Sequence, residues 1–269
     1  MKKIIPFIFI LLLTLSADSE AAYRIISLAP NTTEILFSLG LGDSIVALDN
    51  FSNYPEGVRG IERIGTFTNP DMERIILLKP DCILVNSGLE KSKEEYLKGL
   101  GIKVMKISPK SMEDLYRDIS GMGEFFNKQK EAGAIIEDMR SRIKGVSGRM
   151  GRARPRVFVQ IFDDPLTTVS FFIGDIIRLA GGENIASDIK DDSGIFSYEA
   201  LVHRNPDAIL VIGFSRTDNF SPAINAVKNN RIYRGLDPDI FLRPGPRSAE
   251  AVEKLNEILT SGNFSTLLP

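Results

Sequence analysis

Short apolar runs alternate with helical patterns along the chain from residue 24 onward. The runs are rich in β-branched residues, which is typical of buried strands, whereas the segments between them carry apolar residues three or four apart, which indicates helices. Strands are predicted at residues 24–28, 45–48, 82–85 and 104–107, and helices at 32–39, 70–78 and 91–99. Because strands and helices alternate, the pattern predicts a parallel α/β layer structure.

A longer helical pattern follows. Ser111 with Asp114 resembles a capping box, and Gly145 is a suitable stop signal. A helix over residues 112–144 would measure about 50 Å at ~1.5 Å per residue, enough to connect two lobes. Interior glycines each cost about 1 kcal/mol relative to Ala, so a kinked helix or a pair of helices is an alternative linker. These glycines are Gly121, Gly123 and Gly133.

An internal repeat supports two lobes of similar plan. The pattern of residues 73–85 reappears in residues 199–211, at a constant offset of 126 residues. In both copies a helix begins near a Glu and ends before Pro-Asp, and a buried strand follows at once. A chance similarity between two ordinary αβ units is the alternative interpretation.

The N-terminus carries a targeting pattern. Lys2 and Lys3 precede an apolar run at residues 4–15, and the small residues Ser19 and Ala21 follow. This is the layout of a secretory signal peptide. The run is shorter than the roughly 20 residues that cross a bilayer as a helix, so an uncleaved anchor is the less favoured alternative. Cleavage after Ala21 predicts a periplasmic or otherwise extracytoplasmic protein.

The predicted fold class is therefore α/β, with two Rossmann-like lobes that contain parallel-type sheets and are joined by one long α-helix. The expected domains are a signal peptide at 1–21, an N-terminal lobe at 22–109, a linking helix at 110–150 and a C-terminal lobe at 151–269.

Composition excludes several classes of function. A net charge of −2 without a block of Lys and Arg leaves no electrostatic footprint for nucleic acid. One histidine, His203, and one cysteine, Cys82, are too few for a structural zinc site, an internal disulfide or the capture of a bare transition metal. A dinucleotide site is excluded because Ile45 stands where the third glycine of the fingerprint is required. No resident cofactor is predicted.

Five segments carry a pattern that resembles one known family. They are Ile25-Ile26-Ser27-Leu28-Ala29-Pro30-Asn31-Thr32-Thr33-Glu34-Ile35-Leu36, Asn53-Tyr54-Pro55, Met72-Glu73-Arg74-Ile75 with Lys79-Pro80-Asp81, Gly181-Gly182-Glu183-Asn184, and Leu236-Asp237-Pro238-Asp239 with Arg243-Pro244-Gly245-Pro246-Arg247. The chain from about Arg24 to Leu259 resembles the single-helix-hinge substrate-binding proteins of ABC importers, which carry cobalamin, ferric siderophores and haem. The resemblance implies a ligand cleft between the lobes.

The resemblance also implies partners. These are a permease dimer with ATPase subunits and a small-molecule metal chelate, and the protein itself is expected to be a monomer in solution. In the resembled family one Glu on each lobe docks against arginines of the permease, which implies this role for Glu73 and Glu199. The alternative is that each carboxylate merely offsets a helix dipole, for about 0.3 to 1 kcal/mol, with Asn69 or Ser197 as the cap.

Within the family the pattern is closest to the vitamin B12-binding members, which implies aromatic ligand contacts at four positions. Aromatic side chains cover the flat apolar face of a corrinoid at low entropic cost, and core packing is the alternative role for each of them. The implied contacts are Phe51, Tyr54, Phe67 and Phe196. The chain has no Trp, whereas the B12 binders place Trp where Phe67, Phe196 and Ile240 stand.

Charged residues complete the candidate ligand site. Arg243 and Arg247 flank a Pro-Gly-Pro turn, from which guanidinium groups could bind an anionic ligand rim, and surface or capping roles are the alternative. Asp163 and Asp164 follow a predicted strand at residues 157–162, at a carboxyl end where α/β ligand sites tend to lie. Either could accept hydrogen bonds from ligand amides or be an ordinary loop acid.

The predicted function is capture of a bulky metal chelate, with cobalamin favoured. A ferric siderophore or haem is the alternative ligand, and Tyr54 and Tyr198 are the candidate axial ligands for haem. A chelatase-like enzyme that acts on tetrapyrroles is the remote alternative from another class. Such an enzyme needs a general base within a His and Glu cluster, and because His203 stands alone no catalysis is expected.

Overall fold

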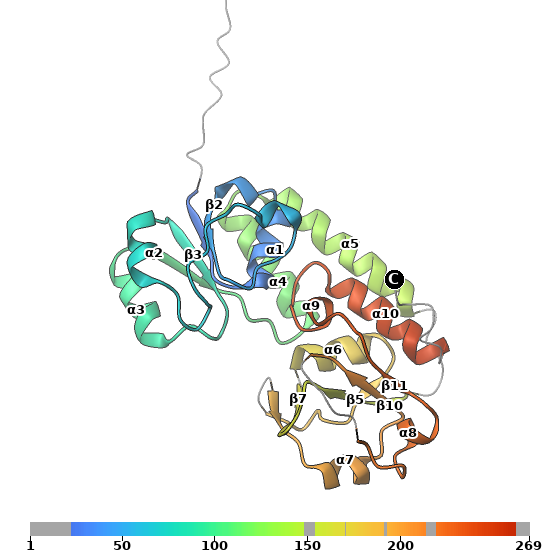
Figure 1. Cartoon of the computed structure of the whole chain (residues 1–269). Coiled ribbons are helices and arrows are strands. Elements are labelled where there is room, and N and C mark those ends of the chain that lie inside the picture. The colour runs from blue at the N-terminus through green and yellow to red at the C-terminus, as the bar shows by residue number, and fades with distance from the viewer. Residues whose placement is uncertain (1–22, 148–153, 170, 191–192, 214–218, 262–269) are drawn as a thin grey trace, which may run out of the picture.

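The structure is a computed structural model that describes residues 23–147, 154–169, 171–190, 193–213 and 219–261. Figure 1 shows two α/β lobes with helices running along one side of both. The predicted signal peptide and its cleavage site after Ala21 lie outside the described residues. Within the described ranges, no helix is long and apolar enough to span a membrane.

The N-terminal lobe is built on a four-stranded parallel sheet in the order β2-β1-β3-β4. Its strands are β1 (Ile25–Ser27), β2 (Ile45–Leu48), β3 (Cys82–Val85) and β4 (Lys103–Lys106). Its helices are α1 (Pro30–Ser38), α2 (Met72–Leu78), α3 (Lys91–Gly99) and the 3-10 turns η1 (Gly42–Ser44) and η2 (Glu56–Val58). The central strands β1 and β3 are buried along their whole length, because apolar layers cover both faces of the sheet.

The C-terminal lobe repeats this topology in the order β11-β10-β5-β8, again all parallel. Its strands are β5 (Arg156–Gln160), β8 (Glu183–Asn184), β10 (Ala208–Val211) and β11 (Ile232–Tyr233), and a separate antiparallel sheet holds β6 (Phe162–Asp163), β7 (Leu166–Val169) and β9 (Ser193–Ile195). Its helices are α6 (Phe171–Leu179), α7 (Tyr198–Arg204), α8 (Asn225–Lys228), α9 (Pro238–Phe241) and α10 (Ser248–Ser261). Counted in chain order within each parallel sheet, the second strand lies on one side of the first strand and the third strand lies on its other side.

The Pro-Asp pairs of the sequence repeat have the same structural role in both lobes. The Asp81 carboxylate accepts a hydrogen bond of 2.7 Å from the N–H of Arg24, next to the start of β1. The Asp207 carboxylate accepts one of 2.9 Å from the N–H of Arg156, at the start of β5. Each aspartate therefore fastens the beginning of the third strand of its lobe to the beginning of the first strand.

The linker differs from the single helix predicted over residues 112–144, because it consists of α4 (Met112–Phe125) and α5 (Gln129–Ser147). The break does not occur at a glycine. Asn127 adopts a left-handed conformation with φ 56°, and the N–H of Lys128 donates to the carbonyl of Gly123 at 2.7 Å. This is a Schellman-type helix end, in which Asn tolerates the left-handed position. The one long helix that runs beside both lobes is α5 (Figure 1).

Gly123 allows α4 and α5 to pack closely. A Cβ atom at this position would lie 2.5 Å from the Cβ of Ala132 on α5, a distance that real side chains do not tolerate. The residue that weakens the helical pattern in the sequence is therefore a packing site in the structure.

The hydrophobic core extends across both lobes on the side of α5. One continuous cluster joins fully buried side chains of α1, α4, α6 and α10, for example Leu36, Leu115, Ile177 and Leu255. Each sheet also has a smaller cluster on its other face. Burial of apolar surface therefore fixes the lobes to each other along this side and leaves the opposite side open to a cleft.

Candidate functional site

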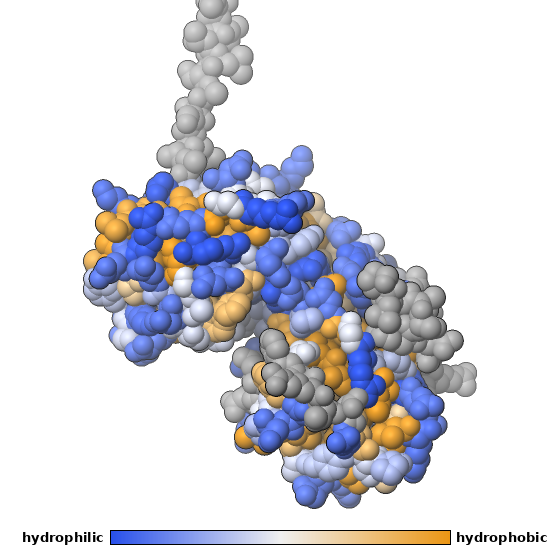
Figure 2. Space-filling view, in the orientation of Figure 1, coloured by the Kyte–Doolittle hydropathy of each residue, from blue (hydrophilic) through white to orange (hydrophobic). Residues whose placement is uncertain are grey.

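A cavity of about 320 Å³ lies between the lobes. Its N-terminal wall is formed by segments that follow the carboxyl ends of three parallel strands: Pro30 and Asn31 after β1, Asn86 and Ser87 after β3, and Ile107, Ser108 and Pro109 after β4. Strand order reverses between β1 and β3, and the crevice at such a switch point is where open α/β sheets bind ligands. In the space-filling view the surface is hollowed between the lobes (Figure 2).

The C-terminal lobe supplies the other wall of the cavity. It contains Val169 from β7, Phe172 and Ile173 from α6, and Phe241, Leu242, Arg243 and Pro244 from α9 and the loop after it. The wall is mainly apolar, and Figure 2 shows apolar side chains gathered on the C-terminal lobe beside the hollow. A cavity with apolar walls and a few polar groups is typical of a small-molecule site.

The polar groups of the cavity are mostly neutral. Asn31 and Asn86 carry amides, Ser87 and Ser108 carry hydroxyls, and Arg243 is the one charged side chain among the described residues that line the cavity. The guanidinium of Arg243 is already paired, because it lies 2.7 Å from the Asp239 carboxylate and donates to the Asn53 side-chain oxygen at 2.6 Å. The expected contact of Arg243 with an anionic ligand rim stays a prediction.

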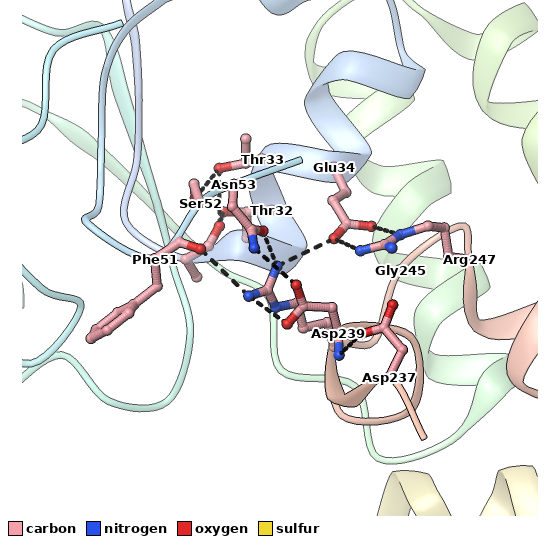
Figure 3. Close-up of polar contacts among 12 residues, drawn as sticks. Thr32, Thr33, Glu34, Phe51, Ser52, Asn53, Asp237, Asp239, Gly245 and Arg247 are labelled. Atoms are coloured by element: carbon pink, nitrogen blue, oxygen red, sulfur yellow. Dashed lines mark hydrogen bonds and ion pairs between the residues drawn. The ribbon is translucent and has the colours of Figure 1, made fainter. Parts of the chain in front are cut away.

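Arg247 fastens the loop of residues 237–247 to the N-terminal lobe. Its guanidinium donates two hydrogen bonds, of 2.8 and 2.5 Å, to the carboxylate of Glu34 on α1, which is 3% exposed (Figure 3). Burial raises the pKa of the Glu34 carboxyl, and the guanidinium of Arg247 opposes this increase. The same guanidinium lies 4.2 Å from the centre of the Tyr54 ring. Arg247 is thus engaged inside the protein and does not line the cavity.

A chain of buried hydroxyls explains why residues 49–54 lie beside α1. Ser27 contacts Thr32 at 2.6 Å and Thr33 at 2.8 Å, and Thr33 contacts Ser52 at 2.8 Å. Ser52 in turn donates to the carboxylate of Asp49. Because every hydroxyl is buried and has a partner, this network holds the loop that carries Phe51 and Tyr54 in one position.

Two of the expected aromatic contacts lie together next to the N-terminal wall. The Phe51 side chain is 51% exposed, and its ring centre lies 6.1 Å from that of Phe67. The Phe67 ring lies on Gly88, where an added Cβ would be 2.6 Å from a ring carbon, and Gly88 follows directly after the cavity residues Asn86 and Ser87. Tyr54 is also exposed, but its ring is covered on one side by Arg247.

Phe196 is not brought to this surface. It is 6% exposed, and its ring packs 5.1 Å from Phe158 within the core of the C-terminal lobe, with the guanidinium of Arg204 at 5.0 Å. Its neighbour Ile195 is 75% exposed instead. Successive residues of extended chain point to opposite faces, so only one of the two can face outward. Ile240 is likewise buried, in α9.

Asp164 does not reach the cavity either. The strand expected to continue to residue 162 ends at Gln160, and the chain turns back as the hairpin of β6 and β7. Asp164 lies exposed in the turn of this hairpin. Its proposed hydrogen bonds to ligand amides have no support from its position.

The antiparallel sheet supplies an apolar row that the sequence analysis missed. Thr167 lies two residues before the cavity residue Val169 on β7, so both point to the same face. Phe162 on β6 and Ile195 on β9 lie directly opposite Thr167 in register, and both are exposed. The row Phe162–Thr167–Ile195 therefore lies on the same face of the sheet as the cavity residue Val169. Asn86 and Ser108 were also missed, although their place just after predicted strands is a signal that could have found them.

Glu73 and Glu199 lie exposed in the first turns of the equivalent helices α2 and α7. The side chain of Ser197 caps α7, as expected, by accepting the N–H of Ala200 at 3.0 Å. The cap of α2 is Asp71, which accepts the N–H of Arg74 at 2.9 Å, and not Asn69 as expected. Neither glutamate is itself the cap, and their docking role stays a prediction.

Residues 25–238 match the family model described as a periplasmic binding protein. The vitamin B12-binding protein of Yersinia pseudotuberculosis is 32% identical over 259 residues, which cover 94% of this chain and 92% of that protein. The ABC transporter substrate-binding lipoprotein YvrC of Bacillus subtilis strain 168 is also 32% identical, over 258 residues that cover 90% of this chain and 81% of the relative.

Solved structures show the same similarity. The periplasmic vitamin B12 binding protein BtuF of Vibrio cholerae has a TM-score of 0.79 at 27% identity, and the match covers 88% of this chain and 96% of BtuF. The periplasmic heme-binding protein RhuT of Roseiflexus sp. RS-1 has a TM-score of 0.76 at 21% identity, with 89% and 98% covered. The second match shows a shared fold only.

Proposed function

Because the chain belongs to the periplasmic binding protein family, as a substrate-binding protein of the vitamin B12, siderophore and haem class of ABC importers, we propose that its cleft captures cobalamin. A permease and its ATPase are the partners that this family implies. The proposed role is to bind the ligand between the lobes, leave it chemically unchanged and deliver it to the permease. The relatives are binding proteins, which favours this role over catalysis on a tetrapyrrole.

The neutral polar chemistry of the cavity carries the preference for cobalamin. The corrin ring of cobalamin carries neutral amides around its rim and a single phosphate in its nucleotide tail, whereas haem and many ferric siderophores present carboxylates or other anionic groups at the rim itself. The amides and hydroxyls of Asn31, Asn86 and Ser108 can exchange hydrogen bonds with rim amides. An anionic rim would need an unpaired cation, and Arg243 is paired with Asp239.

The apolar surfaces beside the cavity support the same ligand class. Phe51 and Phe67 offer aromatic surface on the N-terminal lobe, and Phe162 with Ile195 offers apolar surface on the other lobe. A ligand larger than the 320 Å³ cavity would enter it with one edge and lay its flat apolar face on these side chains.

Haem is less well supported. None of the described residues lining the cavity is a Tyr or a His that could serve as an axial ligand. The Tyr54 ring is covered by Arg247, and the Tyr198 hydroxyl donates to the carbonyl of Asn219 at 2.9 Å.

Calorimetric titration of the purified protein with cyanocobalamin, haemin and a ferric siderophore panel tests the ligand. We expect one-to-one binding of cyanocobalamin, and tight binding of haemin or a siderophore with no cobalamin signal would refute the proposal. Phe51→Ala should weaken the binding about tenfold. Tyr96→Ala is the matched control, because Tyr96 is 52% exposed but lies on α3 and does not line the cavity, and it should leave the affinity unchanged.

We propose that Glu73 and Glu199 dock the loaded protein on the permease. Two acids in equivalent helices of two lobes can engage two permease subunits at once, which favours correct orientation and fast association. Reversal of both charges should abolish transport without changing ligand affinity in solution. An equal loss of ligand binding would contradict the docking role.

The proposed site of action is outside the cytoplasm, after removal of residues 1–21. Mass spectrometry of the exported protein tests this directly: a mature chain that begins at Ala22 is expected, and retention of Met1 in the exported protein would contradict it.

A further inference from the structure

The helices α2 and α7, which carry Glu73 and Glu199, correspond in their buried residue, their length and the backbone conformation that ends them. At the offset of 126 residues, Ile75 corresponds to Leu201, and both side chains are fully buried. Each helix has seven residues, and each is followed by a residue in the left-handed conformation with φ 46°, Lys79 in α2 and Asn205 in α7. Both helices lie on the side of their lobe remote from α5 (Figure 1).

The exposed positions differ. Residues three and four positions after a helical residue lie on the same face, so the side chains next to Glu73 are Ile76 and Leu77. Both are exposed, Ile76 at 39% and Leu77 at 69%, so they form an adjacent apolar pair on the surface of α2. The matching residues next to Glu199 are Val202, which is partly buried, and His203, which is exposed and polar.

We propose that Ile76 and Leu77 form an apolar docking contact beside Glu73, and that the C-terminal lobe has no equivalent, so that the permease engages the two lobes by different chemistry. This inference rests on the proposed docking of Glu73 and Glu199. The occupant that fits the surface of the N-terminal lobe is a basic side chain of the permease flanked by apolar residues, because an acid and a leucine lie side by side on one helix face. On α7 the positions that correspond to Ile76 and Leu77 hold the partly buried Val202 and the polar His203, and the exposed ring beside Glu199 is Tyr198, which carries a hydroxyl.

The two contacts should respond differently to salt. Burial of apolar surface depends little on ionic strength, whereas interactions between exposed charges weaken as the Debye length falls from about 10 Å at 0.1 M to 3 Å at 1 M. The contact of the N-terminal lobe therefore retains part of its strength in high salt, and the contact of the C-terminal lobe loses most of its strength.

The test measures binding of the full-length mature protein to its permease and ATPase complex in lipid nanodiscs, at about 0.1 M and about 1 M salt. Leu77→Ser should weaken the complex about tenfold at both salt concentrations, as expected for an apolar side chain buried at an interface. His203→Ser should change the dissociation constant of the complex less than twofold. The matched control is Leu100→Ser, which removes another exposed leucine of the same lobe outside α2 and should have no effect.

The outcomes separate this inference from the docking proposal. Glu73→Gln and Glu199→Gln are measured in parallel, with the thermal unfolding midpoint as the check on folding. If the glutamate variants weaken the complex and Leu77→Ser does not, the apolar contact is wrong and docking by the glutamates stands. If His203→Ser and Leu77→Ser weaken it equally, the proposed asymmetry is wrong. If none of these variants has an effect, the docking proposal fails together with this inference.

Discussion

The ion pair between Glu34 and Arg247 offers a direct test of how the loop of residues 237–247 is held. The informative change is Arg247→Met, which removes the guanidinium but keeps an unbranched apolar side chain over the Tyr54 ring. Glu34, which is 3% exposed, then loses both short hydrogen bonds from this partner. The remaining cation is Arg243, whose Nη1 atom lies 3.9 Å from the Glu34 carboxylate.

The structure sets the size of the effect. Removing one partner of a buried ion pair costs 3–5 kcal/mol, because the other charge is left without compensation. Since Arg243 still compensates part of the charge, we expect the low end, about 3 kcal/mol of the free energy of unfolding at pH 8. Glu34 in the variant can escape the penalty by taking up a proton, because burial already raises its pKa. The cost should therefore shrink as the pH is lowered.

Urea unfolding of four proteins measures this effect: the parent, Arg247→Met, Glu34→Gln and the double variant. The double variant should be more stable than Arg247→Met at pH 8, because it has no buried charge, and the coupling energy should be about 2 kcal/mol. A coupling below about 0.5 kcal/mol would show that the pair behaves as an exposed one. A cost of Arg247→Met that does not depend on pH would refute the assignment of the penalty to the Glu34 charge.

The remaining predictions concern stability. Gly123→Ala should destabilise the protein by about 2 kcal/mol in urea unfolding, because its Cβ would overlap Ala132. Gly121→Ala, on the same helix, places its Cβ in open space and should stabilise the protein by up to about 1 kcal/mol. Equal effects of the two substitutions would refute the packing role of Gly123. Burial raises the pKa of Asp118 from 3.8 to about 6, so the folded state binds more protons between these values and the free energy of unfolding falls as pH rises through this window. Asp118→Asn should therefore stabilise the protein by about 2 kcal/mol at pH 8 and by almost nothing at pH 3, and a gain that persists at pH 3 would contradict this origin.

The hydrophobic pattern and the internal repeat predicted the bounds of several strands and the equivalence of two helices. The strands β2 and β3 begin and end at the residues expected, because apolar β-branched runs between turn residues have few alternatives inside a two-sided sheet. The repeat at offset 126 also predicted equivalent helices, and the structure adds that the lobes share their strand order.

Two differences between the expected and the observed positions have clear physical reasons. The linker breaks at Asn127, whose short polar side chain tolerates a left-handed backbone, whereas Gly123 remains helical because α5 needs the space. The resemblance implied a ligand contact for Phe196, which stays a prediction, but its ring packs in the core and Ile195 takes the outward position, because neighbouring residues of extended chain point to opposite faces. Residue type alone does not distinguish neighbouring positions that point in opposite directions.

The contacts of Arg247 with Glu34 and of Arg243 with Asn53 could not be predicted from local patterns, because these partners are distant in sequence, whereas Asp239 lies only four residues before Arg243. Arg247 binds Glu34, 213 residues earlier, and Arg243 binds Asn53, 190 residues earlier. From the sequence alone, either arginine is equally suited to bind an anionic ligand. Glu34 and Asn53 decide the role of these arginines, and only the fold brings these two partners to them.

The contact of Arg247 also fixes one wall of the cavity. Phe241 and Pro244 line the cavity and belong to the loop that Arg247 fastens to the N-terminal lobe, so this part of the wall keeps its distance from Asn31 and Ser108. The antiparallel sheet contributes Val169 to the cavity from the body of the C-terminal lobe. A bulky ligand therefore meets, at Phe241 and Pro244, a surface whose position relative to the N-terminal lobe is set by the ion pair between Arg247 and Glu34.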